Sequence, residues 1–91
     1  MIYLDNAATT KVNEKVLESM MPYFSEIYCN PSAAYSFATK GRIAIEEARN
    51  HAAKLIGASD MEIYFTSGGS ESDNWALKAT AEAYESKGKH I

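Results

Sequence analysis

Two adjacent glycines, Gly68 and Gly69, are followed by Ser70 at the point where the sequence pattern changes from strand to helix. Residues 62–65 include β-branched and aromatic side chains and predict a short buried strand. Residues 74–81 are rich in alanine and predict a helix. The first N–H groups of a helix lack intrahelical acceptors, and the helix dipole is positive at that end. Because glycines let the backbone approach a bound group closely, the pattern indicates a site for a phosphate or another anion.

The same residues fit a simpler interpretation, in which the glycines serve only the geometry of a tight turn. Ser70 would then be the N-cap of the helix, and Asp73, three positions later, would complete a capping box. Spacing alone does not separate this interpretation from anion binding. The segment matches neither the P-loop pattern nor the dinucleotide pattern G-x-G-x-x-G, which argues against nucleotide binding.

Three segments resemble, in the same order, motifs of the cysteine desulfurases. Residues 65–74, F-T-S-G-G-S-E-S-D-N, are similar to the family pattern F-T-S-G-[GA]-T-E-[SG]-[DN]-N. Residues 3–10, Y-L-D-N-A-A-T-T, and residues 30–32, N-P-S, match two further motifs. The resemblance covers essentially the whole chain. It implies a pyridoxal-phosphate (PLP) enzyme of the class-V aminotransferase family, with the aminotransferase-like fold type I.

The resemblance also implies a function for a longer parent protein. Cysteine desulfurases convert L-cysteine to L-alanine and pass the sulfur, as an enzyme persulfide, to an acceptor protein for iron–sulfur clusters or other pathways. Gly69 and Ser70 match the pair that contacts the PLP phosphate, Gly69 through its N–H and Ser70 through its N–H and hydroxyl. Members of this family are homodimers, so the parent is expected to be one.

No catalytic residue of the family is expected in this chain. None of its lysines matches the motif of the lysine that binds PLP, and the sulfur-carrying cysteine of the family lies in a loop much nearer the C-terminus. The resemblance therefore implies an N-terminal fragment that is inactive by itself. Cys29 has no nearby histidine or basic cluster, so we expect a free, partly buried thiol. No metal site is expected, because His90 has no second ligand at usable spacing and His51 lies among polar residues.

The segment around Asn30 departs from the family pattern, which is close to F-G-N-P-S-S-x-H-x-x-G. Four positions differ from that pattern: Cys29 replaces a glycine, Ala33 a serine, Tyr35 the histidine and Ala38 the second glycine. The resemblance therefore leaves open the backbone geometry of this loop and any role of the histidine in the pocket.

Composition limits the chain to one small domain and narrows its partners. Lysines and arginines are scattered and the net charge is −3, which argues against nucleic acid or an anionic membrane as the main partner. No apolar run approaches the ~18 residues of a membrane span, and the N-terminus lacks a signal-peptide pattern. A single cysteine excludes an intrachain disulfide. A cytoplasmic location is the natural expectation.

Local signals place the first helix. Asn13 suits its N-cap, and Pro22 should kink or end it near Met21. An apolar stripe at helical spacing is typical of a core-facing surface, and its members include Val16, Met20 and Phe24.

Two longer helices follow in the pattern. One is predicted over residues 36–56, with Gly57 as its C-cap. The other is predicted over residues 70–86, with Trp75 as its main apolar anchor and Gly88 as its C-cap.

The elements together predict an α/β fold class. By resemblance this is the N-terminal part of the PLP-dependent transferase (aminotransferase-like) fold, mostly helical here with one or two strands, at residues 62–66 and from about residue 89. Residues 1–12 would form an N-terminal arm, and residues 13–91 the beginning of an incomplete PLP-binding large domain. One strand and the start of another cannot form a sheet, so the chain is expected to stop partway through the fold.

Two other functions stay open at this stage. The parent could be another fold-type-I enzyme, such as an aminotransferase, a kynureninase-like lyase or a selenocysteine lyase. A non-enzymatic alternative is a helical fragment that folds by associating with itself or with a partner.

Overall fold

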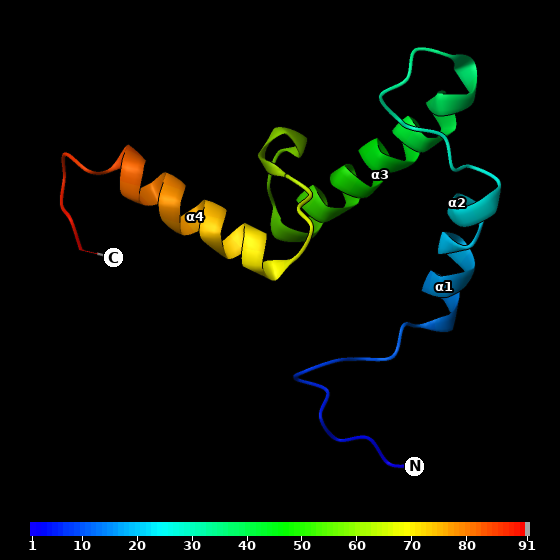
Figure 1. Cartoon of the computed structure of the whole chain (residues 1–91), viewed down its shortest axis with the longest axis horizontal. Helices are drawn as coiled ribbons and strands as arrows, with labels where there is room; N and C mark the ends of the chain where they lie inside the picture. The colour runs from blue at the N-terminus through cyan, green and yellow to red at the C-terminus, as the bar shows by residue number, and fades with distance from the viewer. Residues whose placement is uncertain (91) are drawn as a thin grey trace. The chain divides into compact units, whose positions relative to one another are not determined.

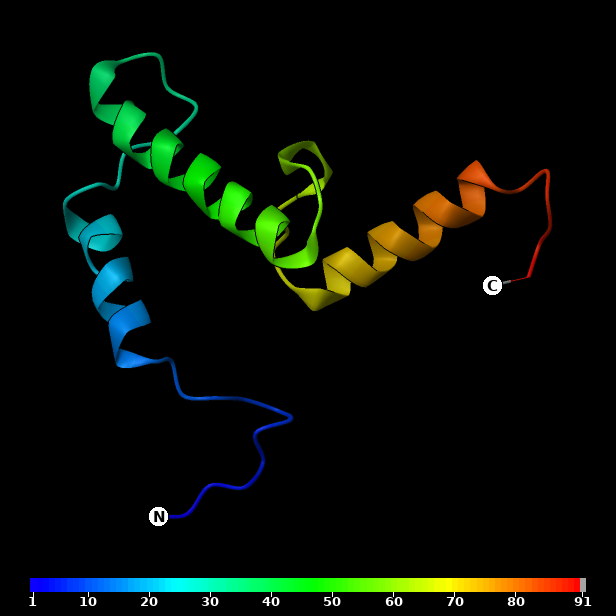
Figure 2. The same ribbon diagram turned by 180° about the vertical axis from the view of Figure 1, so that it is seen from behind.

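The computed structural model describes residues 1–90 and divides the chain into two compact units, residues 1–51 and 52–91, with the boundary inside α3. The first unit holds α1 (Glu14–Met20), α2 (Pro22–Ser25), the 3-10 helix η1 (Ser36–Ala38) and most of α3 (Thr39–Ile56). The second unit holds the end of α3, the 3-10 helix η2 (Asp60–Glu62) and α4 (Gly69–Ala83). Figures 1 and 2 show these elements from opposite sides, with α3 and α4 as the longest helices.

The segment before α1, residues 1–12, contains no helix or strand. A turn forms at Asp5, whose carbonyl oxygen accepts the Ala8 N–H at 3.0 Å and the Tyr3 hydroxyl at 2.9 Å. The Tyr3 hydroxyl also pairs with the Thr9 hydroxyl at 2.5 Å. The small polar residues of this segment therefore form a loop.

The predicted start and end of the first helix are confirmed. The Asn13 side chain accepts the Lys15 N–H at 2.9 Å and caps α1. Proline lacks the N–H that a continuing helix needs, and its ring restricts the preceding residue. Accordingly α1 ends at Met20, and the short helix α2 begins with Pro22 in its first position.

The apolar stripe of this region was expected to face a core, and in the structure it is exposed. Val16 is 51% exposed, Met20 43% and Phe24 69%. A helical stripe identifies the face that needs a partner, but burial requires a partner element, and α1 contacts the even shorter α2. Of the described hydrophobic residues, only Ala38 and Ala53 are fully buried.

The loop before η1 packs against the start of α3. The Asn30 side chain accepts the Ser32 N–H at 3.0 Å, and the Asn30 backbone carbonyl accepts the Ala33 N–H at 3.0 Å, which closes a turn at Asn30 and Pro31. Buried Gly41 lies against this turn, since a Cβ there would meet the Cys29 carbonyl oxygen at 3.6 Å.

The predicted second helix is confirmed over residues 36–56, its first turn being the 3-10 helix η1. Gly57 adopts a φ of +70°, the left-handed conformation that ends many helices. The next amide, Ala58 N–H, donates to the Ala53 carbonyl at 2.9 Å. This bond spans the end of α3 and satisfies a carbonyl that would otherwise lack an intrahelical donor.

The strand predicted over residues 62–66 does not form in the part of the chain that the structure describes. Glu62 belongs to η2, where its side chain accepts the Ser59 N–H at 2.7 Å and completes a capping box. Ile63 follows with extended angles, φ −101° and ψ 125°. Extended angles suit a strand, but a strand also needs a hydrogen-bonded ladder with a neighbouring strand, and residues 1–90 provide none.

The predicted end of the last helix is wrong. The helix α4 ends at Ala83 with Tyr84 as its C-cap, so Gly88 lies beyond the cap. Instead, the Lys87 N–H donates to the Tyr84 carbonyl at 2.8 Å, and the Lys87 ammonium lies 4.8 Å from the centre of the Tyr84 ring. This local turn replaces the last helical turn that the sequence pattern predicted. Of the strand expected from residue 89, residues 89 and 90 are not in a strand, and residue 91 lies outside the described residues.

Candidate anion-binding site

The helix α4 begins at Gly69, one residue earlier than predicted. Its N-cap is Gly68, which has an extended backbone (φ 165°, ψ −177°) and makes no side-chain cap. The prediction that Ser70 caps the helix is therefore wrong, because a cap must precede the helix and Ser70 is its second residue. The predicted capping box with Asp73 fails for the same reason. Both predicted cofactor residues, Gly69 and Ser70, now lie in the first turn itself.

A carboxylate takes the place of the missing cap. One oxygen of Glu71, Oε2, accepts both the Ser67 N–H and the Ser67 hydroxyl, each at 2.6 Å. These two hydrogen bonds hold the pKa of Glu71 below its ordinary value of 4.5, and slight desolvation opposes them. Glu71 is the third residue of α4, so the carboxylate also sits favourably at the positive end of the helix dipole.

A second pair of side chains links the loop to the first turn of α4. The Thr66 hydroxyl pairs with the Ser72 hydroxyl at 2.6 Å and lies 3.1 Å from the Gly68 carbonyl oxygen. The same carbonyl accepts the Ser72 N–H at 3.2 Å, which is the first hydrogen bond of the helix. Residues 66–68 are therefore held to the first turn of α4 by two side-chain contacts, Ser67 with Glu71 and Thr66 with Ser72.

The amides of Gly69 and Ser70 remain available to a ligand. Among residues 1–90 no acceptor binds either N–H, and the Ser70 hydroxyl makes no hydrogen bond. Apart from the adjacent residues and the backbone of α4 itself, no atom of residues 1–90 lies within 4 Å of the position that a Cβ would take at Gly68 or Gly69, so the space beside this backbone is open. Two unpaired N–H donors, a free hydroxyl and a helix N-terminus suit the oxygens of a phosphate group.

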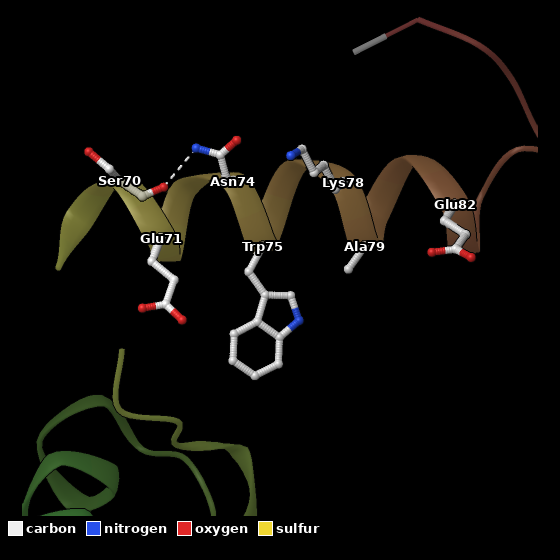
Figure 3. Close-up of a pocket in the computed structure, with 7 residues that line it drawn as sticks. All are labelled: Ser70, Glu71, Asn74, Trp75, Lys78, Ala79 and Glu82. Carbon is white, nitrogen blue, oxygen red and sulfur yellow. Dashed lines mark hydrogen bonds between the residues drawn. The ribbon is translucent and has the colours of Figure 1, made fainter. Parts of the chain in front are cut away.

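The exposed side chains of α4 continue away from this end. Figure 3 shows Ser70, Asn74 and Lys78 along one side of the helix, with the Asn74 side-chain amide donating to the Ser70 carbonyl at 2.8 Å. Trp75 projects from another side of the helix, and its ring meets Tyr64 edge to face with centroids 5.2 Å apart. Trp75 is still 49% exposed, so it anchors α4 only in part.

Sequence reasoning missed Glu71 and Thr66 as parts of this site. A capping-box search looks for an acidic residue three positions after the cap, whereas Glu71 reaches back four positions to Ser67. The signal that could have found it is an acidic residue in the first helical turn behind a hydroxyl and two glycines.

Two further residues whose side chains could take part in chemistry, Cys29 and His51, belong to the first unit. Cys29 is a free, half-buried thiol, as predicted, and its hydrogen bond and charge raise the pKa of Tyr35. His51 is exposed, as predicted. Residues 1–90 contain no group of three or more His, Cys, Asp or Glu side chains that could hold a metal ion. Within the same residues, no helix has the length and apolar character needed to cross a membrane.

Comparison with known proteins supports the resemblance. The family model of aminotransferase class-V matches residues 2–91. The chain is 52% identical over 90 residues to a cysteine desulfurase IscS of Methanosarcina thermophila, covering 99% of this chain and 22% of that protein. It is 50% identical over 90 residues to a cysteine desulfurase IscS of Clostridium botulinum (strain Kyoto / Type A2), covering 99% and 23%. It thus spans less than a quarter of the length of either relative.

A solved structure has the same fold over most of the chain. The protein, described as NifS-like, is 44% identical and superposes with a TM-score of 0.86 over 92% of this chain and 23% of its own. This likeness confirms the predicted fold family, while the strands expected within it are not seen in residues 1–90. On the family match and these relatives together, the chain belongs to the aminotransferase class-V family.

Proposed function

We propose that this chain forms part of a PLP-dependent cysteine desulfurase and supplies part of the PLP phosphate site. The similarity to cysteine desulfurases at about half of all positions supports the activity. The observation that carries the role of this chain is the open first turn of α4, where two N–H groups and one hydroxyl lack acceptors among residues 1–90. The activity is proposed for a protein in which this segment is joined to the other segments of its relatives.

In this proposal Gly69 and Ser70 bind and orient the cofactor. The two N–H groups and the Ser70 hydroxyl donate hydrogen bonds to phosphate oxygens, and the dipole of α4 stabilises their negative charge. When bound, PLP supplies the electron sink for the amine of the substrate. The substrate is L-cysteine, the product is L-alanine, and the sulfur leaves as a persulfide for an acceptor protein.

The family resemblance supports the wider arrangement of the protein. We place residues 1–12 in an N-terminal arm and residues 13–91 in the beginning of the PLP-binding large domain. A homodimer in the cytoplasm is the corresponding proposal for the whole protein.

The proposal can be tested by transplanting the segment. The 91 residues replace the matching segment of the Methanosarcina thermophila relative, and alanine formation from L-cysteine is measured with PLP retention after dialysis. We expect the chimera to bind PLP and to form alanine, and the 91-residue chain by itself to form none. A chimera that folds like the recipient but forms no alanine would contradict the proposed activity.

Ser70 variants test the phosphate site within that chimera. Ser70→Ala removes one hydrogen bond to a charged group, which costs about 1.5–3 kcal/mol, so PLP should bind roughly tenfold to a hundredfold more weakly. Ser70→Thr keeps the hydroxyl and should retain PLP. Ser86→Ala, which removes an exposed hydroxyl beyond the end of α4, is the matched control. Equal PLP affinity for Ser70→Ala and Ser86→Ala would exclude the assigned role of the Ser70 hydroxyl.

A further inference from the structure

We infer that Glu71 is a positioning residue that holds the Gly69 and Ser70 amides in the orientation needed to bind a phosphate. The inference rests on the proposed function, because it concerns the same phosphate site. Its basis is the pair of 2.6 Å hydrogen bonds from the Ser67 N–H and hydroxyl to one oxygen of Glu71. Glu71 acts through Ser67 and the loop backbone, and it makes no contact with the ligand itself.

The loop needs such a tie because its backbone is unusually free. Gly68 and Gly69 have no side chains, and apart from their neighbours in the chain and in α4 no described atom lies within 4 Å of the position of an added Cβ, so packing does not restrict them. The N-cap position offers no side-chain oxygen to the first amides of α4. The carboxylate of Glu71 holds Ser67, the residue before the N-cap, and the Thr66–Ser72 hydroxyl pair holds the residue before that at 2.6 Å. The two residues that precede the glycines are thereby both anchored to the first turn of α4.

The negative charge of Glu71 allows phosphate affinity to distinguish a positioning role from simple occupation of the helix N-terminus. A carboxylate in the first turn lies near the phosphate, and like charges repel. If Glu71 merely occupied the helix N-terminus in place of a phosphate, its removal would strengthen phosphate binding. If it positions the amides, its removal weakens phosphate binding even though a negative charge has been lost. The two roles therefore predict changes of opposite sign.

The test uses the full 91-residue chain labelled with ¹⁵N and titrated with inorganic phosphate. Four proteins are compared, namely the unsubstituted chain, Glu71→Ala, Glu71→Gln and the control Asp73→Asn. Asp73 also carries a negative charge near the start of α4, but its side chain makes no hydrogen bond in the described structure. Before phosphate is added, amide exchange and signal positions of Ser67, Gly69 and Ser70 report the order of the loop, and circular dichroism reports helix content.

Glu71→Ala is expected to speed exchange of the Ser67 amide and to move the Gly69 and Ser70 signals, with phosphate affinity roughly tenfold lower. Glu71→Gln keeps an acceptor oxygen and should restore part of the order and affinity. Asp73→Asn should leave the loop signals in place and bind phosphate equally well or slightly better. This combination distinguishes positioning from a general effect of charge.

Three results decide between the claims. Tighter phosphate binding by Glu71→Ala, or unchanged Ser67, Gly69 and Ser70 signals in that variant, overturns the positioning role and leaves the proposed function intact. A second result would be loss of loop order in Glu71→Ala while the unsubstituted chain shows no phosphate-dependent shift at Gly69 or Ser70. This result upholds the role of Glu71 in ordering the loop and overturns the proposed phosphate site. Loss of order together with weaker binding, partly restored in Glu71→Gln, supports both.

Discussion

Replacement of Gly57 by alanine should loosen the end of α3 by a predictable amount. Gly57 has a φ of +70°, and no atom lies within 4 Å of its virtual Cβ position. An added methyl group therefore meets no neighbour, and the cost is only that of the left-handed backbone, about 1–2 kcal/mol. Alanine also reduces the freedom of the unfolded chain, which offsets part of that cost. The net expectation is a destabilisation of about 1 kcal/mol.

The assay follows the bond that depends on this conformation. The Ala58 N–H donates to the Ala53 carbonyl at 2.9 Å across the end of α3, so its hydrogen exchange reports whether the cap is formed. A loss of about 1 kcal/mol corresponds to roughly fivefold faster exchange. Gly57→Asn should lose less, because asparagine adopts left-handed angles more readily than alanine does.

Gly68→Ala is the matched control for this experiment. Gly68 also has open space at its virtual Cβ, but its φ of 165° belongs to extended backbone that any residue adopts. The control should therefore leave Ala58 exchange unchanged. Equal acceleration by Gly57→Ala and Gly68→Ala, or no acceleration by Gly57→Ala, would refute the reasoning from the left-handed conformation.

Three further outcomes follow from single contacts. The pKa of Glu71 is lowered on folding, so the stability gained from its hydrogen bonds to Ser67 is fully present above about pH 4.5 and is lost as the pH falls through the lowered pKa. The NMR signal of the Ser67 amide, followed from pH 7 to 2, should report this loss. A signal that does not change with pH would contradict it. Asn13→Ala should cost α1 about 1 kcal/mol and lower its helical NMR shifts, whereas Asn13→Asp should preserve them. A double-mutant cycle on Tyr64 and Trp75, read from α4 amide exchange, should give a coupling of about 0.5 kcal/mol, near the low end for aromatic pairs because both rings are exposed; additive effects would show that the edge-to-face contact is not formed in solution.

The features that were predicted correctly depend on neighbours in the sequence. The Asn13 cap, the interruption at Pro22 and the left-handed Gly57 are each fixed by one residue and the few that follow it. Such signals act through the backbone of a single turn, so they do not require knowledge of the surrounding fold.

The features that were predicted wrongly or not seen depend on residues farther away or on competing local bonds. Residues 62–66 have strand-like composition, but a strand also needs a neighbour that residues 1–90 do not provide. The apolar stripe that includes Val16 and Phe24 marks a face, while its burial depends on another element. Ser70 matched a cap by residue type, but Gly68 and the reach of Glu71 set the helix start one residue earlier.

The exposed N–H groups of Gly69 and Ser70 were predictable for a physical reason that does not extend to the core. These donors are backbone groups, and any helix start leaves its first N–H groups without intrahelical acceptors, whatever lies around it. Sequence can therefore place Gly69 and Ser70 without knowing the rest of the protein. What sequence reasoning did not supply is the side-chain tie from Glu71 to Ser67, because that tie depends on which carboxylate reaches which donor. A helix start can occur in many proteins, whereas here the residues before the glycines are hydrogen-bonded to the first helical turn, which limits the orientations that the exposed N–H groups can take.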